Sequence, residues 1–394
     1  MNVRLTLPFL NAGHFLIHYS MLIFPTAVIA IEKEWGLRYG DALALGSVGY
    51  AAFALATLPF GWLGDRVDRR WLMIAFFLGS GVFCIVAGMA ASGVMLMIGL
   101  AGIGFFAAIY HPVGLALLTD LAERKGRAIA INGVYGNLGL AGAALISAWL
   151  SRSFGWRSAF LVPGCVCILT GLAFAMVVPP AAKSSDTANS VRQLPQLTGW
   201  SQVRVLVVVM LSALFGGSIF NGVTITLPKV FEERLGDLAG DLSDVGNYVA
   251  LVFSIAAFAQ LPVGSVLDRY GAKPVLLVLL SAQALALLIA SQSSGASLVA
   301  AALILVTGIF AEIPVTSWLL GHYVNSEWRA RAYAGEYVLS LGVSAIIVPL
   351  IASAHNQGFG FSIVYQVLVA SACVVLTAAL FLPDSAAQQM AKSD

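Results

Sequence analysis

The chain has 394 residues, of which 59% are hydrophobic and only 10% are charged. A soluble domain carries about 25% charged residues, so this composition excludes an ordinary soluble fold. The net charge of +2 gives no reason to expect a nucleic-acid partner. The four cysteines lie inside apolar stretches, which argues against a disulfide framework and against a zinc motif. We therefore expect an integral membrane protein without a cofactor.

Twelve apolar stretches of about 20 residues follow one another, each long enough to cross a membrane as a helix. They cover residues 7–30, 42–63, 72–91, 94–119, 127–150, 157–178, 203–228, 246–266, 273–291, 297–321, 330–353 and 362–383. The first stretch has no cleavage site of small residues, so we expect no cleaved signal peptide. The predicted organisation is all-α: a six-helix half at 1–178, a cytoplasmic linker at 179–202 rich in Pro, Ser, Ala and Gln, and a second six-helix half at 203–394.

The two halves repeat one another at a nearly constant distance along the chain. Asp65 and Asp268 stand in matching turns 203 residues apart (268 − 65), and Pro59 matches Pro262 at the same offset. A parallel repeat is typical of transporters whose two helical halves enclose a binding site near the middle of the membrane.

The distribution of Lys and Arg predicts the orientation of the chain. If the N-terminus is cytoplasmic, the inner segments hold 15 of the 21 basic residues and the outer segments hold the other six (21 − 15). Basic residues concentrate in cytoplasmic loops of membrane proteins. We therefore expect both termini in the cytoplasm and the protein in a bacterial inner membrane.

The turn at 61–70, Gly-Trp-Leu-Gly-Asp-Arg-Val-Asp-Arg-Arg, concentrates charge between two apolar stretches. A carboxylate there can accept hydrogen bonds from the N-terminus of a neighbouring helix and pair with arginine, which would hold one conformation. The simpler alternative is a charged turn that only marks a cytoplasmic loop. Because Gly-x-x-x-Asp-Arg recurs in the same register, we predict a conformational latch. Its residues are Gly61, Asp65, Arg66, Arg70, Asp268 and Arg269.

The repeated turn, the twelve spans and the central linker together resemble the major facilitator superfamily over the whole chain. The resemblance implies two pseudo-symmetric six-helix halves, transport by alternating access, and a latch that stabilises the outward-facing state. Tyr110-His111-Pro112, the basic loop at 123–127 and Gly136-Asn137-x-Gly139 further resemble the fosmidomycin-resistance branch of exporters.

Two acidic residues lie deep inside predicted spans, Glu312 in the tenth and Glu336 in the eleventh. Ionisable groups at that depth are costly and by default mark a substrate or proton pathway. The alternative is a protonated or sealed acid with a structural role. We predict that both carry protons.

Three histidines of the first half form a second candidate group. His14 and His18 lie four residues apart on one face of the first span, and His111 lies in the middle of the fourth. Imidazole suits reversible protonation near neutral pH, although each histidine alone could be a core residue that only forms hydrogen bonds. Metal binding by these histidines with Glu312 and Glu336 is another alternative, but no Cys/His motif supports it and no metal is predicted. The whole predicted pathway comprises His14, His18, Tyr19, Tyr110, His111, Asn132, Tyr135, Asn137, Asn221, Glu312, Tyr333, Glu336 and Tyr337.

The function predicted from the sequence is export of a small organic solute in exchange for protons. Proton-coupled uptake of an organic acid is the main alternative, and a metal carrier or a sensor without transport is less favoured. No nucleophile with a matching base occurs, so we expect no enzyme activity and assign no catalytic residue. The expected partners are the solute, protons and the lipid bilayer, with the protein as a monomer.

Overall fold

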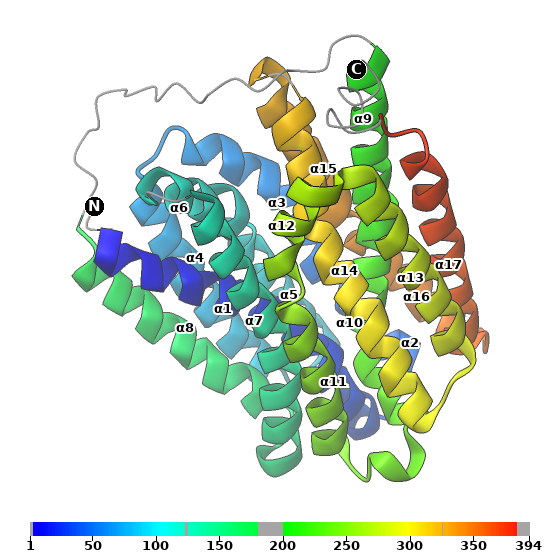
Figure 1. Cartoon of the computed structure of the whole chain (residues 1–394). Helices are drawn as coiled ribbons and strands as arrows, with labels where there is room; N and C mark the ends of the chain where they lie inside the picture. The colour runs from blue at the N-terminus through cyan, green and yellow to red at the C-terminus, as the bar shows by residue number, and fades with distance from the viewer. Residues whose placement is uncertain (1–2, 123–124, 180–199, 325, 384–394) are drawn as a thin grey trace, which may run out of the picture.

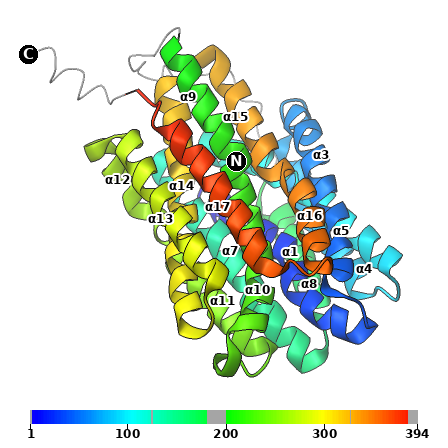
Figure 2. The same cartoon turned by 90° about the vertical axis from the view of Figure 1, so that its right-hand side faces the viewer.

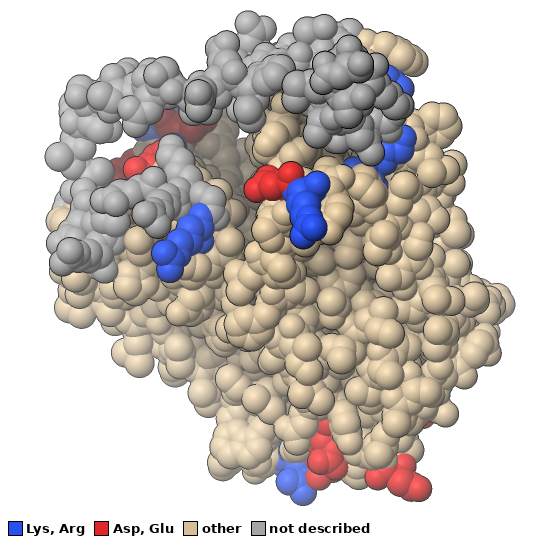
Figure 3. Space-filling view, viewed as in Figure 1, with Lys and Arg blue, Asp and Glu red and all other residues tan. Residues whose placement is uncertain are grey.

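The computed structural model describes residues 3–122, 125–179, 200–324 and 326–383. Twelve segments of this part of the chain are long and apolar enough to span a membrane, which confirms the predicted number of spans. In the space-filling view, charged side chains gather at two opposite ends and an uncharged band lies between them (Figure 3). The band is the surface that a lipid bilayer would cover.

Helices of the first half lie mostly on the left in Figure 1 and those of the second half on the right. The first half consists of α1 (Val3–Trp35), α2 (Tyr39–Ala44), α3 (Ser47–Gly64), α4 (Arg69–Gly88), α5 (Gly93–Ala107), η1 (Tyr110–Gly114), α6 (Leu115–Leu121), α7 (Lys125–Phe154) and α8 (Ser158–Val177). The second half consists of α9 (Trp200–Leu211), η2 (Ser212–Gly216), α10 (Gly217–Arg234), η3 (Gly236–Leu238), α11 (Leu242–Ala257), α12 (Gln260–Tyr270), α13 (Ala272–Gln292), α14 (Gly295–Tyr323), α15 (Ser326–Gly342), α16 (Ser344–Asn356) and α17 (Gly360–Ala379). Most of the predicted linker, 180–199, lies outside the described residues.

Several predicted spans are interrupted helices. The fourth span changes from α5 to a π-helical turn, η1, and continues as α6. Pro112 lies inside this turn and has no backbone N–H to donate, so it disturbs the regular hydrogen-bond ladder. The π-turn presents His111 in the interior of the half, where the side chain is only 8% exposed. Irregular turns of this kind inside a helix are frequent at functional sites.

Glycine permits the closest helix contacts within the first half. A Cβ at Gly104 of α5 would overlap the carbonyl oxygen of Gly49 on α3. A Cβ at Gly139 of α7 would likewise overlap the carbonyl oxygen of Phe15 on α1. Between helices in a membrane, such small residues allow the backbones to approach and increase van der Waals contact.

The two halves pack against each other through α7 with α11, α1 with α10, α2 with α16, and α3 with α15 and α16 (Figures 1 and 2). At the end predicted to be outer, ion pairs join the halves. Lys229 lies 2.5 Å from Glu32, and Lys33 lies 2.7 Å from Glu232. These ion pairs close the structure at this end, which is named the outer end after the predicted orientation.

Candidate functional site

The three predicted histidines come together in the first half. His14 and His18 lie one turn apart on α1, with ring centroids 5.0 Å apart. His111 of η1 lies 5.4 Å from His14 and 5.5 Å from His18, centroid to centroid. His14 and His111 are buried, whereas His18 is half-buried. The helical spacing that placed two of them on one face is thus consistent with the structure.

A hydrogen-bond network behind this cluster fixes His14. Its Nδ1 lies 2.7 Å from the carbonyl oxygen of Asn132, and Tyr110 stacks on its ring at 5.1 Å. The Asn132 side chain donates to Asn11 and to Tyr110, and Tyr110 donates to the carbonyl oxygen of Leu10. Tyr110 and Asn132 are fully buried. Both residues position His14, and direct contact of either with a solute stays a prediction.

The two predicted carboxylates have different partners in the second half. Glu312 of α14 accepts a hydrogen bond of 2.9 Å from Gln283 of α13. Glu336 of α15 interacts with Thr316, which lies one turn beyond Glu312 on the same face of α14. Both partners are neutral side chains that can donate and accept hydrogen bonds. Proton transfer through either residue remains untested.

The halves meet beside the histidine cluster. The ring of Tyr337 on α15 lies 5.8 Å from that of His111. Nearby, Asn221 of α10 donates to the carbonyl oxygen of Ser340, which ties α10 to α15. Tyr333, one turn before Tyr337, donates to the carbonyl oxygen of Ser317 on α14. α15 therefore touches the cluster of the first half while it is held by α10 and α14.

The remaining predicted pathway residues are dispersed. Tyr19 is only 3% exposed and belongs to the large apolar core, whereas Tyr135 is 43% exposed. Asn137 is 5% exposed, and its side-chain nitrogen has no hydrogen-bond partner among the described residues. These three side chains do not join the histidine cluster.

Among the described residues, the hydrogen bonds, ion pairs and ring contacts of the predicted latch residues of the first half stay within that half. Asp65 is 75% exposed and lies 3.8 Å from Arg69, which pairs with Asp120 at 2.5 Å. Arg66 lies over the ring of Trp62. Arg70 donates to the carbonyl oxygens of Val178 and Ala175 and so covers the end of α8.

The other latch positions differ in exposure. Gly61 approaches Pro112 of η1, since a Cβ there would lie 3.6 Å from the proline ring. Asp268 and Arg269 of the second copy are exposed. The predicted latch would stabilise the outward-facing state. In a structure that is closed at its outer end we expect the latch to be released, so the latch stays a prediction.

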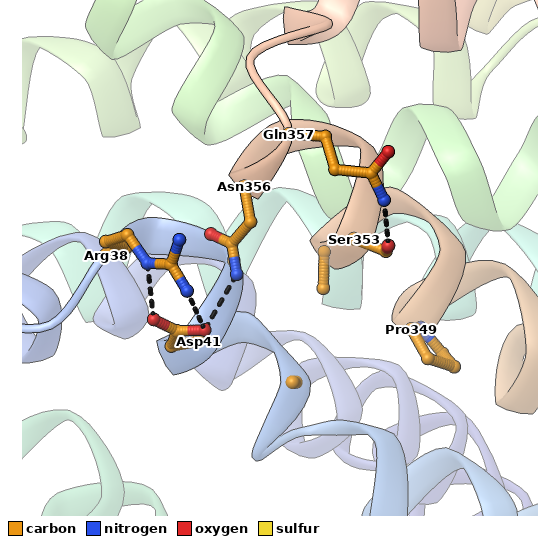
Figure 4. Close-up of a pocket in the computed structure, with 9 residues that line it drawn as sticks. Arg38, Asp41, Pro349, Ser353, Asn356 and Gln357 are labelled. Atoms are coloured by element: carbon orange, nitrogen blue, oxygen red, sulfur yellow. Dashed lines mark hydrogen bonds and ion pairs between the residues drawn. The ribbon is translucent and has the colours of Figure 1, made fainter.

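The ion pairs at the outer end were not predicted from the sequence. Lys229 and Glu32 are each 9% exposed, and Lys229 also lies 3.0 Å from Glu232. Beside them, Asn356 of the second half donates to Asp41 of the first at 2.7 Å, within a groove of about 420 Å³ (Figure 4). The residues of both contacts lie at the ends of predicted spans, where charged side chains are common. Their pairing therefore becomes visible only in the folded structure.

Comparisons with known proteins agree with this architecture. The chain is 26% identical over 213 residues to the putative niacin/nicotinamide transporter NiaP of Bacillus subtilis, and the aligned region covers 52% of each chain. It is 28% identical over 184 residues to the gentisate transporter of Corynebacterium glutamicum, covering 44% of this chain and 40% of that one. The matches thus span about half the length of these relatives or less.

The solved structure of a D-xylose–proton symporter has the same fold. Its TM-score is 0.72 at 16% sequence identity, and the match covers 97% of each chain. The family profile of the Major Facilitator Superfamily matches residues 10–237 and 230–394, which is nearly the whole sequence. The chain therefore belongs to the Major Facilitator Superfamily, and its fold and relatives are those of transporters, not of enzymes.

Proposed function

We propose that the chain carries a small aromatic carboxylate across the membrane together with protons, by alternating access. The observation that carries this proposal is the set of buried and half-buried ionisable groups between the predicted membrane faces. These are the three clustered imidazoles of one half and the carboxyl groups of Glu312 and Glu336 in the other. The names of the two relatives support the class of solute, because niacin and gentisate are both aromatic carboxylic acids.

The histidine cluster offers the chemistry for recognising such a solute. Imidazole N–H groups donate hydrogen bonds to a carboxylate, and a protonated imidazole adds charge to that bond. His18 is the least buried of the three. Tyr337 of the facing half, whose ring lies 5.8 Å from that of His111, adds an aromatic face to the cluster. The charged Lys and Arg groups of the described spans lie towards the helix ends, so the central anion site depends on imidazole.

Membrane energetics favour coupling to protons. Moving one negative charge inward against a potential of 100 mV costs about 2.3 kcal/mol. One proton carried with the anion cancels this cost, and a second makes the inward movement favourable. The carboxyl groups of Glu312 and Glu336 are the proposed carriers. Binding of the solute and of protons must differ between the two states of the transporter for the cycle to run in one direction.

The structure represents one of these proposed states. Ion pairs between the halves join its predicted outer end, and the ion pair of the latch residue Asp65 is with Arg69 of its own half. In the opposite state the ion pairs would separate and Asp65 would engage the second half. The proposal places the protein as a monomer in a bacterial inner membrane with both termini inside.

Export remains the alternative direction. Export in exchange for protons and kinship with the fosmidomycin-resistance branch stay predictions from the sequence. They require the same buried proton carriers and differ from our proposal in the direction of the solute relative to the protons. The test must therefore report direction as well as activity.

The proposal is tested with purified protein in liposomes and radiolabelled nicotinate or gentisate outside. With a membrane potential negative inside and an acidic exterior, the account predicts accumulation above that in protein-free liposomes, which control for passive entry of the protonated acid. Collapse of both gradients with an ionophore should abolish accumulation but leave exchange. No saturable uptake or exchange of any aromatic acid would overturn the proposal. Efflux driven by inward proton flow would reassign the chain as an exporter.

A further inference from the structure

The histidine cluster has the geometry of a metal site. His14, His18 and His111 each bring a ring nitrogen to within 4.8 Å of the other two. In a tetrahedral zinc site with Zn–N bonds of about 2.05 Å, ligand nitrogens lie roughly 3.3 Å apart. Small side-chain rotations would close that difference. Two ligands come from adjacent turns of α1 and the third from the π-turn η1, so one ion would join these two elements.

The hydrogen bond of His14 prepares it as a ligand. A carbonyl oxygen can only accept, so the Asn132 carbonyl, 2.7 Å away, requires that His14 Nδ1 carry the hydrogen. Nε2 then keeps its lone pair. A metal-bound histidine generally donates its other N–H to a carbonyl or carboxylate in this way. Gly136 leaves space at that nitrogen, because a Cβ there would lie 2.7 Å from Nε2.

His111 supplies a second, independent indication. Its side chain is 8% exposed, and within the described part of the chain its Nδ1 has no hydrogen-bond partner. A buried polar atom left unpaired costs about 1–3 kcal/mol. Coordination of a cation would satisfy it. The ring of His111 lies in the same cluster as the two α1 imidazoles, which have a lone pair to offer whenever they are neutral.

We propose that His14, His18 and His111 bind one first-row transition-metal dication of the zinc class through three imidazole nitrogens, with the fourth position open. Neutral imidazoles suit such ions, and three histidines plus one exchangeable ligand is an established arrangement for zinc. The half-buried His18 leaves the cluster accessible on its side. The metal would occupy the imidazoles that the proposed function assigns to the solute, and with the metal bound the solute carboxylate would take the open fourth position.

The experiment measures Zn²⁺ binding to the full-length protein, purified in detergent with an affinity tag that contains no histidine. Calorimetry should show one Zn²⁺ per chain, and Co²⁺ should give the visible absorption bands of a tetrahedral site. His111→Gln or His18→Gln should weaken binding at least 100-fold. His322→Gln and His355→Gln are matched controls, since both histidines lie outside the cluster, and should change nothing.

A second variant keeps all three ligands. Gly136→Ala places a methyl group against His14 Nε2 and should weaken Zn²⁺ binding about 10- to 100-fold, the size of effect seen when the support of a ligand is disturbed. Zn²⁺ should also raise the Tm of the unaltered protein, a readout that needs no variant to fold. The proposal is overturned if the unaltered protein shows no stoichiometric binding and no tetrahedral Co²⁺ spectrum. Binding of equal affinity in the His111→Gln variant would overturn it as well.

Discussion

Lys229 is predicted to hold the outer end of the transporter closed. It bridges Glu32 at 2.5 Å and Glu232 at 3.0 Å, and it is 9% exposed, as is Glu32. Removing one partner of a buried pair costs about 3–5 kcal/mol, because the other charge is left uncompensated. Lys33 remains near Glu232, so we take the lower value. When the outer end is open, water hydrates the same carboxylates, so the loss of Lys229 carries no such free-energy cost in that state.

Lys229→Met should therefore shift the equilibrium between the two states. A cost of about 3 kcal/mol changes the ratio of closed to open roughly 100-fold, so a mixture of about 99:1 becomes about 1:1. Spin labels on Leu37→Cys and Leu238→Cys, in a background without the four native cysteines, report the separation of the outer ends. Both positions are partly exposed, at 38% and 39%, and belong to different halves. The variant should add a longer distance between them.

Two control variants test whether the buried pair of Lys229 and Glu32 holds the outer end closed. Lys33→Met removes the same charge from a side chain that is 65% exposed, and such surface pairs contribute only about 0.2–1 kcal/mol. It should open the outer end far less. Adding Glu32→Gln to Lys229→Met removes the orphaned carboxylate and should restore part of the closed population. An unchanged distance in Lys229→Met, or equal opening in Lys33→Met, would show that the buried pair does not hold the end closed.

Three further predictions concern the interior and the latch. Glu312→Gln keeps a hydrogen-bond partner for Gln283 but cannot release a proton. Solute exchange should therefore persist while proton-driven accumulation falls at least tenfold. Unchanged accumulation would show that Glu312 is not part of the proton pathway. Asp65→Asn should favour the state closed at the outer end, seen as a shorter mean distance between the same spin labels, and no change would reduce the charged turn to a marker of topology. Asn132→Ala leaves the buried hydroxyl oxygen of Tyr110 and the side-chain oxygen of Asn11 without this donor, at about 1–3 kcal/mol, so the Tm should fall. An unaltered Tm would contradict the supporting role of Asn132.

The spans were predictable because the bilayer itself imposes their length and polarity. Twenty apolar residues are needed wherever a helix crosses the hydrocarbon core, so composition alone locates the twelve segments. The spacing of His14 and His18 likewise follows from helical geometry. What the sequence could not show is where these regular helices break. Only Pro112 hinted at the π-turn that directs His111 towards the α1 histidines.

The sequence also could not predict which distant residues pair with each other. Glu32 and Lys229 are 197 positions apart and end different spans, where a charged residue is ordinary. The place of Asn132 in the solute pathway stays a prediction, but its contact with His14 could not be foreseen from the sequence. In the structure Asn132 is fully buried and supports His14 from behind. Such roles depend on which helices become neighbours, and that information is not local.

In the proposed cycle, an aromatic carboxylate and protons cross the membrane together. Its most direct test is the pH inside liposomes that contain the protein and a trapped pH-sensitive dye, after nicotinate or gentisate is added outside without any imposed gradient. The account predicts acidification of the interior that saturates with solute, exceeds that of protein-free liposomes and is lost with Glu312→Gln. Transport of the solute with no difference in pH from protein-free liposomes, or alkalinisation of the interior, would contradict it.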